Sequence, residues 1–82
     1  MEEKLIKEWL DKNDIFYYSL IYTKCYSGVL SISFCQDIDL NNFLELIKYR
    51  SMFNKSRYLI IKENKTVICY GDAATDIIKL IP

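Results

Sequence analysis

The chain has 82 residues, of which 51% are hydrophobic and 15% aromatic, and its formal net charge is zero. This length allows one compact domain, 1–82, with one core, and this composition excludes a disordered chain and a strongly basic nucleic-acid-binding protein. The start of the chain is acidic, and no apolar run approaches the roughly 20 residues that span a membrane, so we expect a cytoplasmic protein without a secretory signal.

The first predicted element is an amphipathic helix over residues Glu2–Lys12. Its apolar residues recur at helical spacing and form one stripe, which consists of Leu5, Ile6, Trp9 and Leu10. Asn13 and Asp14 follow this stripe and are residue types that end helices.

A β-hairpin is predicted next, over residues Ile15–Cys35. Its even-numbered positions carry large apolar side chains, namely Tyr18, Leu20, Tyr22, Leu30, Ile32 and Phe34. The odd-numbered positions are mostly serine and threonine. A three-residue loop at residues 26–28 keeps the two faces apart by pairing Tyr22 with Ile32, whereas a two-residue loop mixes them. In the three-residue loop Gly28 would occupy the left-handed position of a bulged turn.

The second predicted helix covers residues Leu40–Arg50, with Asp39 as its N-cap. One apolar stripe recurs at i, i+3, i+4 and i+7 and consists of Leu40, Phe43, Leu44 and Ile47. A further apolar row, formed by Leu46, Tyr49 and Phe53, makes the apolar side of this segment unusually broad.

A second hairpin is predicted over residues 57–70, with its turn at residues 63–65. Its first strand is apolar on both faces, with Leu59 and Ile61 on one side and Tyr58 and Ile60 on the other. Such strands are typical of the centre of a sheet or of a sheet covered on both sides. A last helix is predicted from Asp72, its N-cap, with the inward positions Ala74, Ile77, Ile78 and Ile81.

The predicted order α-β-β-α-β-β-α indicates an α+β fold, a four-stranded antiparallel sheet with helices mainly on one face. Residues 2–35 and 40–70 repeat the αββ pattern, either through internal duplication or as two independent units, and the helix at 72–81 closes the domain. Because three short helices do not readily cover both faces of a sheet, an apolar patch is expected to remain.

Residues that carry catalysis or bind metals are scarce. The chain has no histidine, the commonest general base and metal ligand. Its three cysteines, Cys25, Cys35 and Cys69, form no C-x-x-C motif and fit a reducing compartment. The closest acidic pair, Asp37 and Asp39, is better explained by a loop and a helix cap than by a metal. We expect no catalytic residue, metal or cofactor, and therefore no enzyme.

Two groups of residues are candidates for binding a partner. The candidate interface consists of large apolar and aromatic residues: Tyr17, Tyr26, Leu46, Tyr49, Phe53, Tyr58 and Ile60. The candidate basic patch comes from segment 48–65, with a balance of +5 against −4 for residues 1–47, and consists of Lys48, Arg50, Lys55, Arg57, Lys62 and Lys65.

These features favour a small non-enzymatic protein-binding domain such as an inhibitor or adaptor, because tyrosine and arginine are enriched where proteins meet. The richness in isoleucine and lysine is typical of AT-rich codons. It is compatible with a phage or mobile-element protein that blocks a host or defence protein. The apolar patch predicts a homodimer or an unknown protein target. The alternative function is a small nucleic-acid-binding protein that uses segment 48–65, and an enzyme is the least favoured class.

Overall fold

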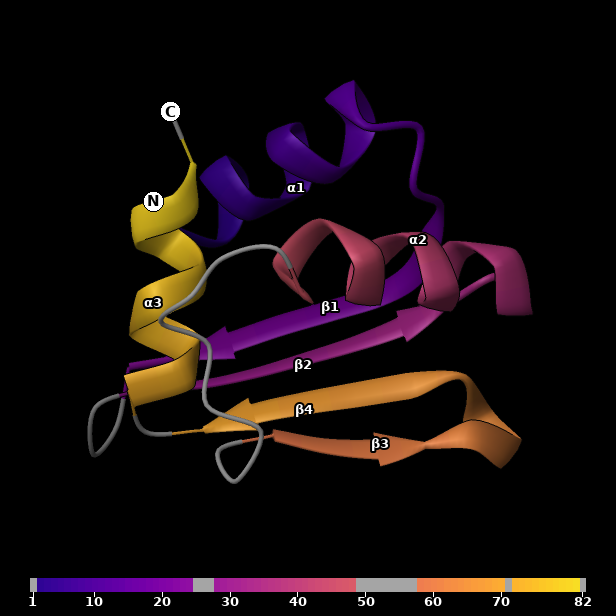
Figure 1. Cartoon of the computed structure of the whole chain (residues 1–82). Coiled ribbons are helices and arrows are strands. Elements are labelled where there is room, and N and C mark those ends of the chain that lie inside the picture. The colour runs from indigo at the N-terminus through magenta and orange to yellow at the C-terminus, as the bar shows by residue number, and fades with distance from the viewer. Residues whose placement is uncertain (1, 25–27, 49–57, 71, 82) are drawn as a thin grey trace.

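The computed structural model describes residues 2–24, 28–48, 58–70 and 72–81 (Figure 1). Along the chain its elements are α1 (Glu2–Lys12), β1 (Tyr17–Thr23), β2 (Val29–Phe34), α2 (Asp37–Lys48), β3 (Tyr58–Ile61), the 3-10 turn η2 (Lys62–Asn64), β4 (Thr66–Tyr70) and α3 (Asp72–Leu80). The predicted α+β order α-β-β-α-β-β-α is therefore confirmed.

The four strands form one antiparallel sheet in the order β1-β2-β4-β3. Each hairpin contributes one edge strand and one central strand, and the hairpins join through the pairing of β2 with β4. The first strand of the second hairpin, predicted to lie at the centre of the sheet or in a sheet covered on both sides, is the edge strand β3, whereas β4 is central. Ile60 of β3 packs against the core, whereas Leu59 on the other side of the strand is 52% exposed.

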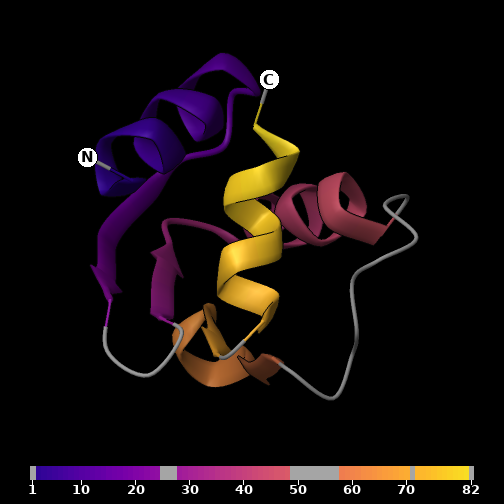
Figure 2. The same ribbon diagram turned by 90° about the vertical axis from the view of Figure 1, so that its left-hand side faces the viewer.

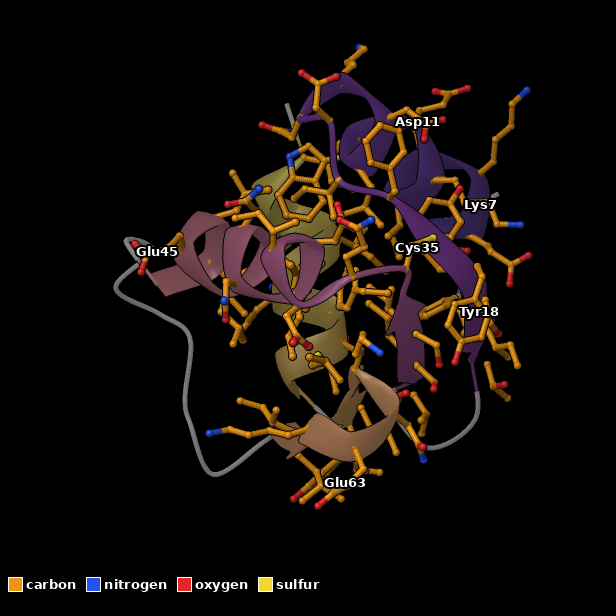
Figure 3. All side chains as sticks on the ribbon, turned by 90° about the vertical axis from the view of Figure 1, so that its right-hand side faces the viewer. Lys7, Asp11, Tyr18, Cys35, Glu45 and Glu63 are labelled. Atoms are coloured by element: carbon orange, nitrogen blue, oxygen red, sulfur yellow. The ribbon has the colours of Figure 1, made fainter. Side chains whose placement is uncertain are left out.

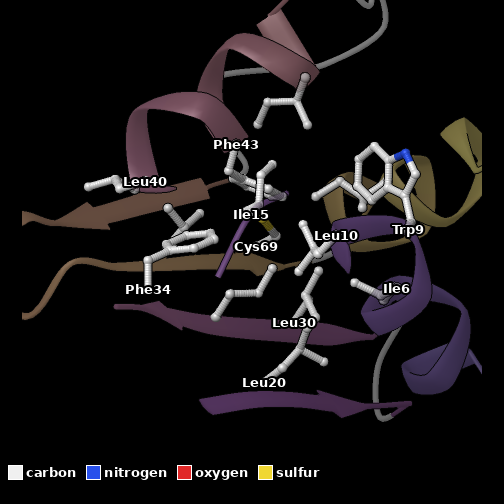
Figure 4. Packing of buried hydrophobic residues seen from close by; sticks show 14 of the residues in the cluster. Ile6, Trp9, Leu10, Ile15, Leu20, Leu30, Phe34, Leu40, Phe43 and Cys69 are labelled. Atoms are coloured by element: carbon white, nitrogen blue, oxygen red, sulfur yellow. The ribbon is translucent and has the colours of Figure 1, made fainter. Parts of the chain in front are cut away.

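The three helices lie on one face of the sheet, as predicted (Figures 1 and 2). Helix α1 packs near β1, α2 over β2, and α3 over β4. The core lies between this layer and the sheet (Figure 4). Its centre contains the Phe43 ring, whose centroid is 5.2 Å from that of Phe34 and 6.4 Å from that of Trp9. These separations are typical of favourable aromatic pairs.

From Ser19 onward the first hairpin keeps its predicted faces but not its predicted register. Tyr22 pairs with Leu30 and not with Ile32. The last paired residues are Thr23 and Val29, so residues 24–28 connect the strands. A shift of two residues leaves every side chain on the same face, so the alternating pattern cannot distinguish the two registers. Gly28 has φ +96°, as expected for a glycine in the left-handed region.

A β-bulge at the start of β1 overturns the predicted position of Tyr18. Tyr17 pairs with Phe34 and Ser19 with Ser33, so β1 has one extra residue between these pairs. As a result Tyr17 contacts the core, whereas the Tyr18 side chain is 67% exposed. Figure 3 shows Tyr18 beside β1.

The predicted helices are confirmed in kind, with two corrections. In α1 Leu5 is 46% exposed, so the buried stripe is narrower than predicted and consists of Ile6, Trp9 and Leu10. Helix α2 begins at Asp37, two residues before the predicted N-cap Asp39, which lies inside the first turn. In α3 Ala74 and Ile77 are buried as predicted, and Ile78 and Ile81 contact the core in part.

Candidate functional site

The sheet face opposite the helices, here called the open face, is covered by no element that the structure describes (Figures 1 and 2). Alternate strand residues point to opposite faces of the sheet, and those that point toward the helices contact the core. The open face therefore consists of Ser19, Ile21, Thr23, Val29, Ser31, Ser33, Leu59, Ile61, Thr66, Ile68 and Tyr70.

Strand pairing places three large apolar side chains of the open face in one row across the sheet, with one serine among them. Ile21 pairs with Ser31, Ser31 with Ile68, and Ile68 with Leu59. Ile21 is 57% exposed and Leu59 is 52% exposed, and both lie on edge strands. In the next row Val29 and Tyr70 are a pair, 38% and 42% exposed. Contiguous apolar surface of this kind marks binding sites on soluble proteins.

No Asp, Glu, Lys or Arg occurs in any of the four described strands. The face of an antiparallel sheet that stays in water normally carries polar and charged side chains, and charges on its edges oppose unwanted pairing. The open face has serine and threonine at its polar positions and no charge. Its composition is thus closer to that of a buried contact than to that of a permanently solvated face.

The hydroxyl groups at one corner of the open face are hydrogen-bonded within the protein. The Thr66 hydroxyl donates to the Asn64 carbonyl oxygen at 3.0 Å, and the Ser33 and Thr66 oxygens are 2.9 Å apart. Because the single Thr66 proton is used on Asn64, Ser33 is the donor of the second bond. Both hydroxyl groups would keep a partner if this corner were covered, so covering them leaves no polar group unsatisfied there.

The edge at β1 is partly closed by α1. The Tyr22 backbone N–H donates to the Glu3 carboxylate at 3.2 Å, in place of a further strand. Lys24, just after β1, forms an ion pair with Glu2 at 3.3 Å. These contacts make the outer edge of β1 a poor site for strand addition and leave the open face as the exposed surface of this hairpin.

Three predicted interface residues lie on the helix side of the sheet and not on the open face. Tyr17, Leu46 and Ile60 are partly buried against the core. Tyr58 belongs to β3, and its side chain lies outside the described part of the chain. Tyr26, Tyr49 and Phe53 also lie outside the described residues.

The described part of the predicted basic patch is small. Lys62 and Lys65 lie at the turn between β3 and β4, where the Lys65 N–H donates to the Lys62 carbonyl oxygen. Lys62 also lines a groove of about 330 Å³ between α2 and β3, together with Asp37, Leu40, Asn41, Leu44 and Ile60. The Lys48 side chain, Arg50, Lys55 and Arg57 lie outside the described residues.

The acidic pair in α2 has a structural role at Asp39. This carboxylate is 3% exposed and accepts the Phe16 N–H at 3.0 Å and the Gln36 N–H at 3.1 Å. The Gln36 contact is the reciprocal half of a capping box, in which a first-turn side chain reaches back to the cap residue. Asp37 is exposed. Within residues 2–24, 28–48, 58–70 and 72–81, no three His, Cys, Asp or Glu residues are grouped closely enough to hold a metal ion.

Sequence reasoning left six apolar residues of the open face out of the candidate interface, namely Ile21, Val29, Leu59, Ile61, Ile68 and Tyr70. Each points to the sheet face opposite the core. In the first hairpin most positions on that face are serine or threonine. The available signal was the absence of charge between Phe16 and Thr23, between Val29 and Phe34, and between Tyr58 and Ile61, because a strand face in contact with water normally carries charged side chains.

The known protein families, the curated proteins and the solved structures with which the chain was compared include none that matches it. Among the helices that the structure describes, none has both the length and the apolar character needed to cross a membrane.

Proposed function

We propose that this chain is a small non-enzymatic protein-binding domain whose contact surface is the open face. The observation that carries this proposal is the row Ile21, Ser31, Ile68 and Leu59, which is apolar at three of its four positions and crosses four strands that carry no charged residue in their described parts. Burial of such a row stabilises a complex at roughly 25 cal/mol per Å² of apolar surface removed from water.

An inhibitor or adaptor needs a rigid surface and no reactive group. The open face is rigid because its other side is the core, where Leu30, Ile32 and Val67 are fully buried. A sheet with one packed face accepts an apolar layer on its second face at a separation of about 10 Å. A partner with an exposed apolar helix or sheet face therefore fits this surface.

Binding of nucleic acid is the alternative. Aromatic rings on a sheet can stack on bases, and Tyr18 and Tyr70 are exposed. Nucleic-acid binding also needs cations beside the rings, and the described strands carry none. The two described lysines of the basic patch lie at the turn between β3 and β4. These observations favour a protein target.

The test compares three immobilised proteins: the wild type, Ile21→Lys and the matched control Ile38→Lys. Ile21 and Ile38 are both isoleucines with 57% exposure, but Ile38 lies on α2, away from the open face. Each is incubated with a lysate of the cells in which the chain is naturally produced, after circular dichroism has verified that it is folded.

The expected result is one protein that the wild type and Ile38→Lys retain in stoichiometric amount and that Ile21→Lys loses. Equal retention by all three proteins would place binding elsewhere, and no retained protein would contradict a protein target. Tight, steeply salt-dependent binding of single-stranded oligonucleotides would support the nucleic-acid alternative.

A further inference from the structure

We propose that, when no target is bound, the open face is covered by the open face of a second copy, and that the two-fold axis of this homodimer runs parallel to the strands between β2 and β4. The inference rests on the proposed function only in using the same surface. It adds a definite partner and a definite geometry.

The absence of charge suits self-association. In a two-fold dimer the same patch meets itself, so a charged residue near the axis would face its own copy and repel it. The open face has no charged residue in its described strands, and its Ser33 and Thr66 hydroxyl groups are already hydrogen-bonded. Covering the face with its copy therefore creates no repulsion between strand residues and no lost hydrogen bond at that corner.

Side-chain size favours the axis parallel to the strands. This axis exchanges β1 with β3 and β2 with β4, and it keeps each row of paired residues opposite the same row of the second copy. In the central row Ser31 then faces Ile68 of the second copy, and Ile21 faces Leu59. In the row that contains Ser19, this serine faces Ile61 of the second copy.

The opposite choice of axis fits poorly. An in-plane axis perpendicular to the strands would place Ser31 over Ser31 and Ile68 over Ile68. Small residues would then leave a void between the copies while large residues collided. At the edges either axis places two large side chains opposite each other, so the two central strands decide, where tight contact needs the large Ile68 opposite the small Ser31. The strand pairing thus selects the axis along the strands.

The size of the open face limits the strength of the dimer. Four strands at about 4.8 Å spacing and about five residues of about 3.3 Å each give a face of roughly 19 Å by 17 Å. Two such faces bury on the order of 1,000 Å² once the relief of the side chains is included, which is below the 1,200–2,000 Å² typical of stable complexes. A reversible dimer with a dissociation constant of roughly 10–100 µM is expected, so a target with a larger contact can displace the second copy.

The experiment is sedimentation equilibrium from about 5 to about 500 µM, a range that brackets a micromolar dissociation constant. The proteins are the wild type, Ile21→Lys, Leu59→Glu, the double variant Ile21→Lys/Leu59→Glu, and the control Ile38→Lys. Within one chain residues 21 and 59 lie on opposite edges of the sheet, three strand spacings or about 14 Å apart. They are too far apart for an ion pair, whereas the proposed axis brings each onto the other across the dimer.

The wild type and Ile38→Lys are expected to dimerise, and each single open-face variant to weaken the dimer at least about tenfold. The double variant is expected to regain part of this loss through two lysine–glutamate pairs between the copies. Circular dichroism checks the fold, and Ile21→Thr, which keeps a strand-forming residue, removes the apolar contact without adding a charge.

A wild type that stays monomeric throughout would overturn the dimer, as would single variants that dimerise like the wild type. A double variant no tighter than the single variants would overturn the proposed axis. These results are separate from the capture experiment. A monomer that still captures its target through Ile21 would leave the proposed function standing, and a dimer that captures nothing would leave only the self-association.

Discussion

Gly28 is the residue whose backbone conformation is most demanding in the first hairpin. Its φ of +96° lies in a region that side chains with a Cβ rarely adopt. A Cβ built there would also lie 2.9 Å from the Tyr22 hydroxyl oxygen. The cost of a substitution at this position is therefore set first by the backbone and then by the Tyr22 ring.

We expect Gly28→Val to lower the free energy of unfolding by about 1–2 kcal/mol or more, because a β-branched side chain is strained at positive φ. Gly28→Asn is expected to cost less, since asparagine tolerates positive φ better than other residues do. Urea titration of the three proteins measures the difference. Equal midpoints for the two variants would show that the backbone at residue 28 does not limit stability.

Cys69 and Cys35 differ in burial, and this sets their reactivity. Cys69 is fully buried on the central strand β4, and burial raises the pKa of its thiol from 9.0 to about 12. The thiolate is the reactive form, and this raised pKa leaves Cys69 almost entirely as the neutral thiol at pH 8. Cys35 is exposed.

A thiol reagent at pH 8 is therefore expected to modify Cys35 rapidly and Cys69 slowly under native conditions. The Cys69 rate should rise as the pH approaches 12 or when urea unfolds the chain. Mass mapping of the labelled peptides at successive times measures both rates. Equal native rates for the two residues would contradict the burial of Cys69.

At the scale of elements, β1 is attached to the helices by two carboxylates. Asp39 of α2 accepts the N–H of Phe16, just before the strand, and Glu3 of α1 accepts the N–H of Tyr22 near its end. These contacts join residues 23 and 19 positions apart in the sequence. An edge strand has one row of backbone groups without a neighbouring strand, and here helix side chains replace part of that neighbour.

Asp39→Ala is expected to lower the free energy of unfolding by about 2–3 kcal/mol, because it leaves the Phe16 and Gln36 N–H groups without their acceptor. Asp37→Ala is the matched control on the same helical turn. Asp37 is exposed, so only its favourable interaction with the helix dipole is lost, about 0.3–1 kcal/mol. Thermal or urea unfolding compares the two. A similar loss for both variants would mean that the Asp39 contacts contribute little.

Local patterns predicted the elements because periodicity and turn residues act over a few positions. The stripes of Ile6, Trp9 and Leu10, and of Leu40, Phe43 and Ile47, are buried as expected. The register of the first hairpin and the bulge at Tyr17 were not predictable in this way, since a two-residue shift preserves the faces and a bulge depends on long-range contacts such as Tyr17 with Phe34.

The position of β3 shows the same limit for the candidate site. The strand residues Leu59–Ile61 are apolar on both faces of the strand. This pattern fits a central strand and an edge strand with an uncovered face equally well. Only the pairing of β2 with β4, which joins residues far apart in the sequence, decides between them. The open face was therefore predictable as an apolar patch but not as a row across four strands.

At the scale of the whole molecule, the charged residues that the structure describes lie in helices and connections and not in the strands. The sequence carries an acidic half, residues 1–47, and the basic segment 48–65. Two kinds of dimer are consistent with this distribution. One joins the uncharged open faces, and the other joins the acidic half of one copy to the basic segment of the other, with Tyr49 and Phe53 in the contact.

Salt distinguishes these two dimers. Burial of uncharged apolar surface is little affected by sodium chloride and is strengthened by sulfate, whereas contacts between exposed opposite charges weaken as the Debye length falls from about 10 Å at 0.1 M to about 3 Å at 1 M. We therefore expect the wild-type dissociation constant to change less than about twofold between 0.1 and 1 M sodium chloride and to fall in sodium sulfate. Tyr49→Glu/Phe53→Glu should leave it unchanged, because the proposed contact is made by the strand residues of the open face. Sedimentation equilibrium at each salt concentration measures the constant. A dimer that dissociates in sodium chloride and is lost in this double variant, but survives Ile21→Lys, would assign self-association to the charged surfaces.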